Sequence, residues 1–103
     1  MDMQILAARL EALGNESRLN IFRTLVRAGP EGLAVGEVQA RIGIARSTLS
    51  HHLHKLIGVG LINQRRERTT LYCVVCFEVL EDTLGFFRAE CCADRGIEEE
   101  NAA

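Results

Sequence analysis

The sequence predicts a mainly α-helical domain with one small β-hairpin. Apolar residues recur at helical spacing through most of the chain, and alternation typical of strands is confined to the stretch from Leu61 to Val75. Glycine and the single proline separate these segments. With 103 residues, of which 48% are hydrophobic, the chain can form one core. We therefore expect one domain over residues 1–95 and a disordered acidic tail over residues 96–103.

The first two helices are predicted over Met3 to Leu13 and over Glu16 to about Ala28. Between them, Gly14 ends the first helix and Asn15 is a suitable N-cap for the second. In the first helix Leu6, Leu10 and Leu13 form one apolar stripe. In the second helix the residues expected to face inward are Leu19, Phe22, Leu25 and Val26.

The stretch from Val35 to Gly60 predicts two helices joined by a tight turn. Gly43 breaks the first apolar stripe, and glycine suits a turn residue with positive φ. The second helix starts near Ala45 and places Leu49, Leu53, Leu56 and Ile57 on one face. Its outer face carries donors and small polar groups of the kind that contact phosphates and base edges: Arg46, Ser47, Thr48, Ser50, His51, His54 and Lys55.

Helix, glycine turn and second helix form a helix-turn-helix signature. The alternative is an ordinary helical hairpin with a solvated face, but such a face normally mixes acidic with basic residues. No acidic residue occurs from Gln39 to Gln64. The formal charge of the whole chain is −2, yet between Arg41 and Arg68 Glu67 is the only acid among six basic residues. This distribution favours local attraction of phosphate.

Two short strands are predicted next, Leu61 to Arg65 and Thr69 to Val75, with a basic tip between them. A hairpin directly after a recognition helix is the wing of a winged helix-turn-helix. Arg65, Arg66 and Arg68 are then expected to lie along the DNA backbone or in the minor groove, unless the tip is simply a solvated loop.

The last helix is predicted from about Phe77 to Ala93. Its apolar residues are spaced 3, 4, 3 and 4 apart, as in a coiled-coil seam: Phe77, Leu80, Leu84, Phe87 and Cys91. Two amphipathic helices, the first and the last, therefore flank the winged core. We expect them to form a homodimer that presents two recognition helices to a palindromic site.

Three segments resemble the arsenical-resistance (ArsR/SmtB) repressors: Glu16 to Ile21 (ESRLNI), Ser47 to Leu53 (STLSHHL) and Gly60 to Ile62 (GLI). The resemblance extends from about Gln4 to Cys92. It implies a homodimeric winged-helix repressor, not an enzyme, that binds double-stranded operator DNA and is released by a metal or metalloid. It also places the histidine segment on the DNA-contacting helix, whereas a metal pair of His51 and His54 is the alternative.

The chain departs from the family pattern at both of the family's best-known sensor sites. Ala34 and Gly36 stand where a pair of thiols would lie, and no histidine follows His54. Cys91 and Cys92 remain, and they resemble a family subset that senses trivalent arsenicals through adjacent thiols near the end of the last helix. Some members of that subset have a further cysteine upstream, for which Cys73 and Cys76 are the candidates.

Thiolate chemistry supports this interpretation, because soft sulfur ligands select thiophilic ions. Arsenite requires three thiolates, whereas methylarsenite, which already carries one carbon, requires two. On a helix, Cys91 and Cys92 would lie about 100° apart, and a third thiolate would come from Cys73, Cys76 or a partner subunit. The alternatives are cysteines that only pack in the core, or a redox- or persulfide-responsive repressor.

The sequence shows no secretory signal and no membrane-spanning run, so we expect a cytoplasmic protein with reduced thiols. The expected partners are operator DNA, a second copy of the chain and a small metalloid inducer, with no membrane and no catalytic cofactor. Two other classes stay open. A thiol oxidoreductase could use Cys73 and Cys76, although no βαβ pattern surrounds them. A protein–protein adaptor could use the same fold without DNA, although the arginine-rich wing argues against it.

Overall fold

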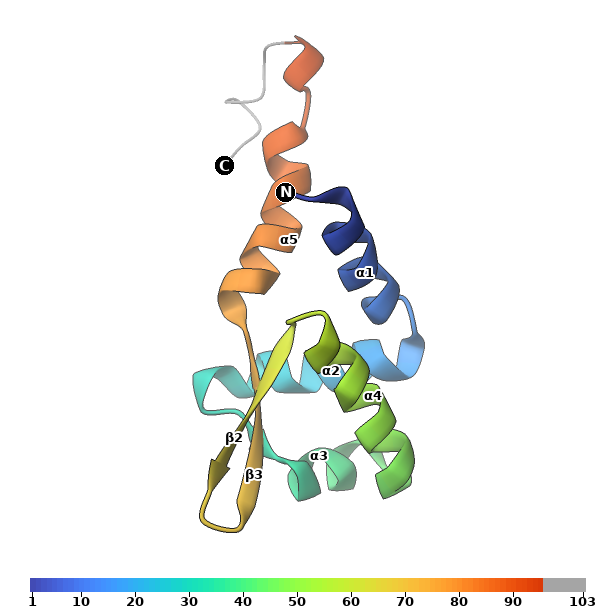
Figure 1. Ribbon diagram of the computed structural model, residues 1–103, viewed down its shortest axis with the longest axis vertical. Helices are drawn as coiled ribbons and strands as arrows, with labels where there is room; N and C mark the ends of the chain where they lie inside the picture. Colours follow the sequence, from blue (N-terminus) through green and yellow to red (C-terminus); the bar gives the residue numbers. More distant parts are fainter. Residues whose placement is uncertain (96–103) are drawn as a thin grey trace.

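A computed structural model describes residues 1–95 and shows five α-helices with a small antiparallel sheet (Figure 1). The tail predicted over residues 96–103 lies outside the described residues. The elements in chain order are α1 (Met3–Leu13), α2 (Glu16–Ala28), the 3₁₀ turn η1 (Gly29–Glu31), β1 (Leu33–Ala34), α3 (Val35–Ile42), α4 (Arg46–Gly58), β2 (Ile62–Glu67), β3 (Thr70–Val75), α5 (Phe77–Glu90) and the 3₁₀ turn η2 (Ala93–Arg95). The predicted fold class is confirmed.

Local chemistry explains where the first helices and the turn begin and end. Asp2 Oδ1 accepts a hydrogen bond from Gln4 N at 2.7 Å and so caps α1. Asn15 is the N-cap of α2, as predicted, and its Oδ1 accepts from Arg18 N at 3.0 Å. Gly43 has φ +78° between α3 and α4, which confirms the glycine turn.

The sheet contains one strand that the sequence pattern does not reveal. Its order is β1-β3-β2, and β1 is two residues long, too short for any periodicity. Gly32 precedes it with φ +72°, and a side chain there would collide with the Cys73 carbonyl of β3. The hairpin is also longer than predicted, because β2 reaches Glu67 and only Arg68 and Thr69 form the turn. Arg68 adopts φ +59°, in the left-handed region.

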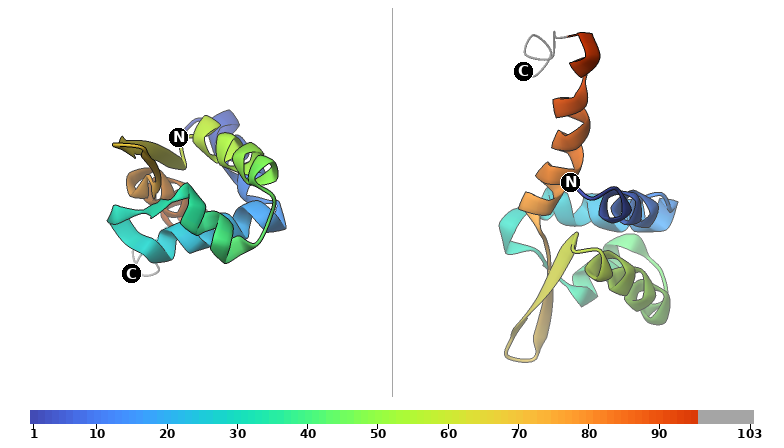
Figure 2. Two further views of the ribbon diagram at one scale, coloured as in Figure 1. Left: turned by 90° about the horizontal axis from the view of Figure 1, so that it is seen from below. Right: turned by 45° about the horizontal axis from the view of Figure 1, so that its top comes forward.

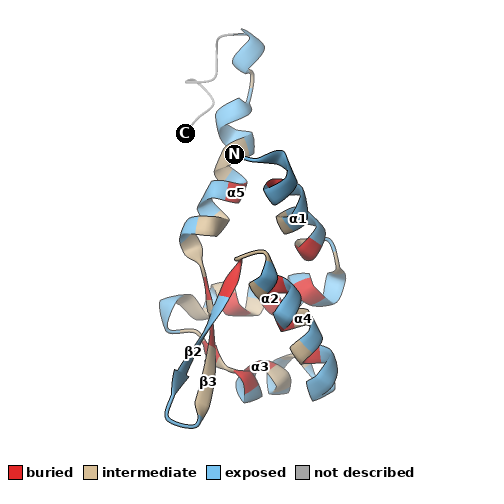
Figure 3. Cartoon of the chain, viewed as in Figure 1, coloured by how far each residue is buried: buried red, intermediate tan, exposed pale blue. Residues whose placement is uncertain are grey.

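The core lies where α2, α4 and the inner sheet residues meet (Figure 3). Leu49, Leu53 and Leu56 of α4 are all buried, as their spacing predicts. The expectation for Leu19 is wrong, since it is 50% exposed and Ile21 is completely buried instead. The core-facing side of α2 is centred on Ile21, Phe22 and Leu25, and Leu19 lies beside it.

In Figure 1 the upper end of the molecule is formed by α1 and α5, and α5 projects away from the winged core (Figures 1 and 2). Arg9 of α1 donates from Nη1 to Thr83 Oγ1 at 3.4 Å, and Thr83 is the one buried residue of α5. The seam residues Leu84 and Phe87 are 50% and 54% exposed. No helix among residues 1–95 is both long and apolar enough to span a bilayer.

Candidate nucleic-acid interface and thiol pair

The outer face of α4 is polar and open to solvent. Arg46, Ser47, Thr48, His51 and Lys55 are exposed, Ser50 is half-buried, and the opposite face of the helix is packed into the core. A helix anchored in this way by its apolar side presents its polar side in a fixed orientation. These are the residues that the sequence predicts as DNA contacts.

The N-terminus of α4 is unusually well suited to an anion. Its N-cap is Ala45, which supplies no side-chain cap, and its first turn contains no acid. The free backbone N–H groups and the positive end of the helix dipole therefore have no counter-charge from their own helix. Arg46 lies at this point, and its Nη1 donates to Gln39 Oε1 of α3 at 3.4 Å.

A hollow of about 440 Å³ separates this helix start from the wing. Its lining includes Arg46, Arg66 of β2, and Val35 and Gly36 at the start of α3. The hollow is therefore lined by the recognition helix, the beginning of α3 and the wing, and it contains two arginines. These elements lie at the lower end of the molecule (Figure 1).

The three wing arginines are not equivalent. Arg65 Nε donates to Glu67 Oε2 at 2.8 Å, and its Nη2 donates to the Glu31 carbonyl at 3.3 Å. Its guanidinium also lies over the Tyr72 ring, 5.2 Å from the centroid. The side chains of Arg66 and Arg68 make no hydrogen bond or ion pair with another residue in the described part of the chain. Arg65 is thus already occupied, whereas Arg66 and Arg68 are available to a ligand.

A buried arginine connects the recognition helix to the α1 end, and sequence reasoning missed it. Arg18 Nε donates to the Ala12 carbonyl at 2.7 Å, and Arg18 Nη1 lies 3.5 Å from His52 Nδ1 of α4. Burial lowers the pKa of His52 below its ordinary 6.5, and the positive charge of Arg18 lowers it further. The periodicity of α2 contained the only available signal, because Arg18 falls on the core face with Ile21 and Leu25.

The thiol pair has a different local structure from the expected one. Helix α5 ends at Glu90, so Cys91 is its C-cap and Cys92 has φ +60° beyond it. The expectation that both lie on the helix about 100° apart is wrong, because the left-handed residue turns the chain. This turn brings the two Sγ atoms to 3.5 Å. The Cys91 thiol, by its hydrogen bond and by repulsion between the two charged forms, raises the pKa of Cys92.

Cys73 and Cys76 lie at the other end of α5. Cys73 is buried in β3 and accepts a 3.7 Å contact from Gln64 Nε2, and Cys76 is half-buried at the N-cap of α5. Burial raises the pKa of both thiols. A helix of 14 residues separates them from Cys91, which corresponds to about 21 Å. Within residues 1–95, no three His, Cys, Asp or Glu side chains are grouped to hold a metal ion.

The fold and this surface define a winged helix-turn-helix protein. A helix-turn-helix domain model matches residues 13–65. A putative arsenical resistance operon repressor of Halobacterium salinarum is 30% identical over 90 residues, which cover 82% of this chain and 71% of that relative. The chain belongs to the ArsR/SmtB family of transcriptional regulators, a DNA-binding family that is not enzymatic.

The relatives of this chain are named for different roles. The nodulation protein NolR of Rhizobium meliloti is 39% identical over 71 residues, and the match spans 69% of this chain but 56% of NolR. The solved structure of HlyU from Vibrio cholerae has a TM-score of 0.70 at 29% identity and covers 87% of this chain and 95% of HlyU. The homodimeric winged helix-turn-helix domain of Mb0332 from Mycobacterium bovis has a TM-score of 0.69 at 28% identity, covering 94% of this chain and 85% of that one.

Proposed function

We propose that two copies of this chain bind a palindromic operator as a repressor, and that trivalent arsenic at Cys91 and Cys92 releases the DNA. The observation that carries the proposal is the pairing of an acid-free, exposed recognition face with two adjacent thiols whose Sγ atoms are 3.5 Å apart. The two features lie at opposite ends of the molecule (Figure 1), as expected of a regulator whose sensor is separate from its DNA surface.

Exposed apolar side chains on α1 and α5 support the homodimer. Leu84 and Phe87 of α5 and Ile5 and Leu10 of α1 are each more than 40% exposed, and a group of large apolar side chains left in water is typical of an interaction surface. A second copy can cover them in a symmetric arrangement. The homodimer described for Mb0332 has the same fold.

The proposed DNA contacts come from two elements. Arg46, Ser47, Thr48, Ser50, His51 and Lys55 of α4 would contact bases and phosphates in the major groove. Arg66 and Arg68 of the wing would contact the flanking backbone, and Arg65 would join them only after exchanging its bond to Glu67.

The inducer site follows from the number of thiols available. Cys91 and Cys92 of one chain provide two sulfur ligands, which suffice for methylarsenite. Arsenite needs a third. Since Cys73 and Cys76 lie at the far end of α5, we place that third thiolate on the partner subunit. Each As–S bond forms as one As–OH bond breaks, and the departing hydroxide takes the thiol proton and leaves as water. The raised pKa of Cys92 keeps that thiol protonated near neutral pH, so we expect its bond to arsenic to form without net release of a proton.

Release would be mechanical. An arsenic atom that bridges the two sulfurs would fix the conformation of the turn after Glu90. A resulting shift of α5 in the dimer interface would change the distance between the two recognition helices. By linkage, operator DNA must weaken inducer binding by the same factor. The switch would be effective if the binding free energy of the inducer differed by about 3–5 kcal/mol between the DNA-bound and DNA-free dimers.

The test is release of bound promoter DNA by arsenite, methylarsenite, antimonite, zinc or hydrogen peroxide. The double variant Cys91→Ser and Cys92→Ser should bind promoter DNA normally but fail to release it. Cys76→Ser, at the opposite end of α5, is the matched control and should respond normally. Release of the double variant by arsenicals would overturn the proposed site. Salt-independent or absent DNA binding by the wild-type chain would instead favour an adaptor role.

The 3.5 Å separation of the sulfurs also supports a second candidate, a thiol-based redox regulator. A peroxide would oxidise the pair, forming one S–S bond while two electrons and two protons reduce the peroxide to water. The raised pKa of Cys92 argues against it, because redox-sensing cysteines are normally low-pKa thiolates. Release by peroxide that is reversed by dithiothreitol, without release by arsenicals, would establish this alternative.

A further inference from the structure

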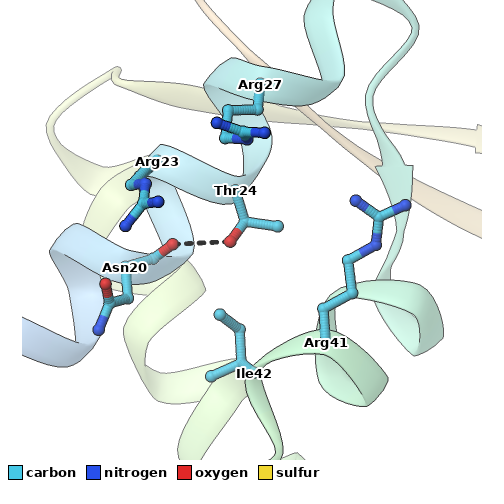
Figure 4. Close-up of a pocket in the computed structure, with 6 residues that line it drawn as sticks. All are labelled: Asn20, Arg23, Thr24, Arg27, Arg41 and Ile42. Carbon is cyan, nitrogen blue, oxygen red and sulfur yellow. Dashed lines mark hydrogen bonds between the residues drawn. The ribbon is translucent and has the colours of Figure 1, made fainter.

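A basic hollow of about 380 Å³ lies between α2 and the end of α3 (Figure 4). Arg23 and Arg27 lie one turn apart on α2, and Arg41 of α3 faces them from the other side. Asn20, Thr24 and Ile42 complete the lining. The surface is separate from the recognition helix and the wing, and no residue in it belongs to the contacts proposed above.

The three positive charges lack compensation from the protein. Among residues 1–95, the one ion pair within 4.0 Å joins Arg65 to Glu67. Hydrogen bonds to other residues are donated by the side chains of Arg9, Arg18, Arg46 and Arg65. The side chains of Arg23, Arg27 and Arg41 donate none within the described chain. Like charges four residues apart on a helix destabilise it. A bound anion would remove this repulsion.

The chemistry of the lining favours phosphate. The guanidinium group presents paired N–H donors that match two oxygens of a phosphate, and it remains charged at any physiological pH. The Thr24 hydroxyl already donates to the Asn20 carbonyl at 2.8 Å (Figure 4), so it is not a free donor. The Asn20 side-chain amide forms no hydrogen bond to the described protein and could donate to a phosphate oxygen.

The position of the hollow indicates the source of the phosphate. Arg41 and Ile42 end α3, directly before the Gly43 turn that leads into the N-terminus of α4. A duplex held by α4 would therefore bring its backbone towards this side of the turn. We propose that Arg23, Arg27 and Arg41 form a second phosphate-binding site, which holds the DNA backbone outside the segment read by α4. The assignment of the phosphate to the DNA backbone rests on the proposed DNA-binding function.

The experiment compares the full-length wild-type chain with Arg23→Gln/Arg27→Gln, with Arg41→Gln, and with the control Arg88→Gln/Arg95→Gln. The control removes two charges near the end of α5, and glutamine preserves helix propensity. Affinity is measured over a range of salt for a promoter duplex that extends about ten base pairs beyond the operator on each side, and for one trimmed to the operator.

The site variants should bind the long duplex more weakly, with a salt slope smaller by about 0.9 for each phosphate that the protein no longer neutralises. On the trimmed duplex, and in the control, affinity should match the wild type. In a second arm, inorganic phosphate is titrated without DNA, and arginine Nε–H and Ile42 methyl signals are followed by NMR.

Phosphate-dependent shifts that disappear in Arg41→Gln, with unchanged long-duplex binding, would assign the site to a free phosphate compound. Unchanged behaviour of the site variants in both arms would overturn the site. If the wild type binds neither duplex, the proposed DNA-binding function fails, and the phosphate arm still decides the site.

Discussion

Helices α4 and α5 have similar apolar stripes in the sequence and opposite surroundings in the structure. Leu49, Leu53 and Leu56 of α4 are 0–2% exposed, because α2 and the sheet of the same chain cover them. Leu84 and Phe87 of α5 are about half exposed. An amphipathic pattern therefore shows that a face is suited to burial, but not which chain buries it. A single chain buries the apolar face of α4 at the lower end of the molecule. The apolar residues of α5 at the upper end are suited to burial by a second copy.

The largest effect is expected from charging the upper end. Leu84→Glu together with Phe87→Glu would place two carboxylates in the proposed dimer interface, where desolvation opposes association. A monomer loses the avidity of two linked half-sites, so operator affinity should fall about 10²- to 10⁴-fold. Analytical ultracentrifugation measures the oligomeric state, and fluorescence anisotropy measures the affinity for the operator. Ala89→Glu, on another face of α5, is the control, and a double variant that remains dimeric would contradict the assigned interface.

The next comparison is one substitution made at both ends. Leu56→Ala should lower the free energy of unfolding by about 2–5 kcal/mol, because it leaves a cavity in a closed core. Leu84→Ala in a Phe87→Glu background, which we expect to be monomeric, should change the free energy of unfolding by less than about 0.5 kcal/mol, since the Leu84 side chain is half exposed. Urea denaturation of both variants in that background measures the difference. Equal losses would mean that the chain itself packs α5 more tightly than described.

A smaller contrast is expected within the wing. Arg66→Gln should reduce the salt slope of DNA binding by about one for each phosphate that Arg66 neutralises. Arg65→Gln should change it less, because Arg65 is engaged with Glu67, the Glu31 carbonyl and the Tyr72 ring. Binding isotherms at several salt concentrations test this order, and a larger effect at Arg65 would show that the Glu67 ion pair opens on DNA.

The smallest effect concerns the link between the two ends. Because the pKa of His52 is lowered in the fold, the neutral ring is the favoured form. Its contribution to stability is present above the unfolded pKa of about 6.5 and is lost as the pH falls through the lower folded pKa. Urea midpoints at pH 7.5 and pH 5 should differ less in His52→Gln than in wild type. His54→Gln is the control, because His54 is exposed. If His52→Gln and the wild type show the same pH dependence of stability, neutral His52 does not stabilise the fold.

Much of the lower end was predictable from local signals. The Asn15 cap, the Gly43 turn and the buried leucines of α4 follow from short-range chemistry and periodicity, which the rest of the fold does not override. The exposed polar face of α4 follows from the same periodicity. The bond from Arg65 to the Glu31 carbonyl and the partners of Arg18 were not predictable, because Glu31, Ala12 and His52 are brought near only by packing between elements.

The sequence by itself determined the order of the elements, the helix-turn-helix with its acid-free face, and the presence of adjacent thiols at Cys91 and Cys92. Only the tertiary structure decided that β1 joins the wing, that Leu19 lies outside the core, and that the buried Arg18 contacts Ala12 and His52. The physical reason is the separation along the chain between the residues that interact. Caps, turns and periodicity act within a few residues, whereas strand pairing, the burial of a given side chain and the partners of a buried arginine depend on contacts between segments far apart in the chain.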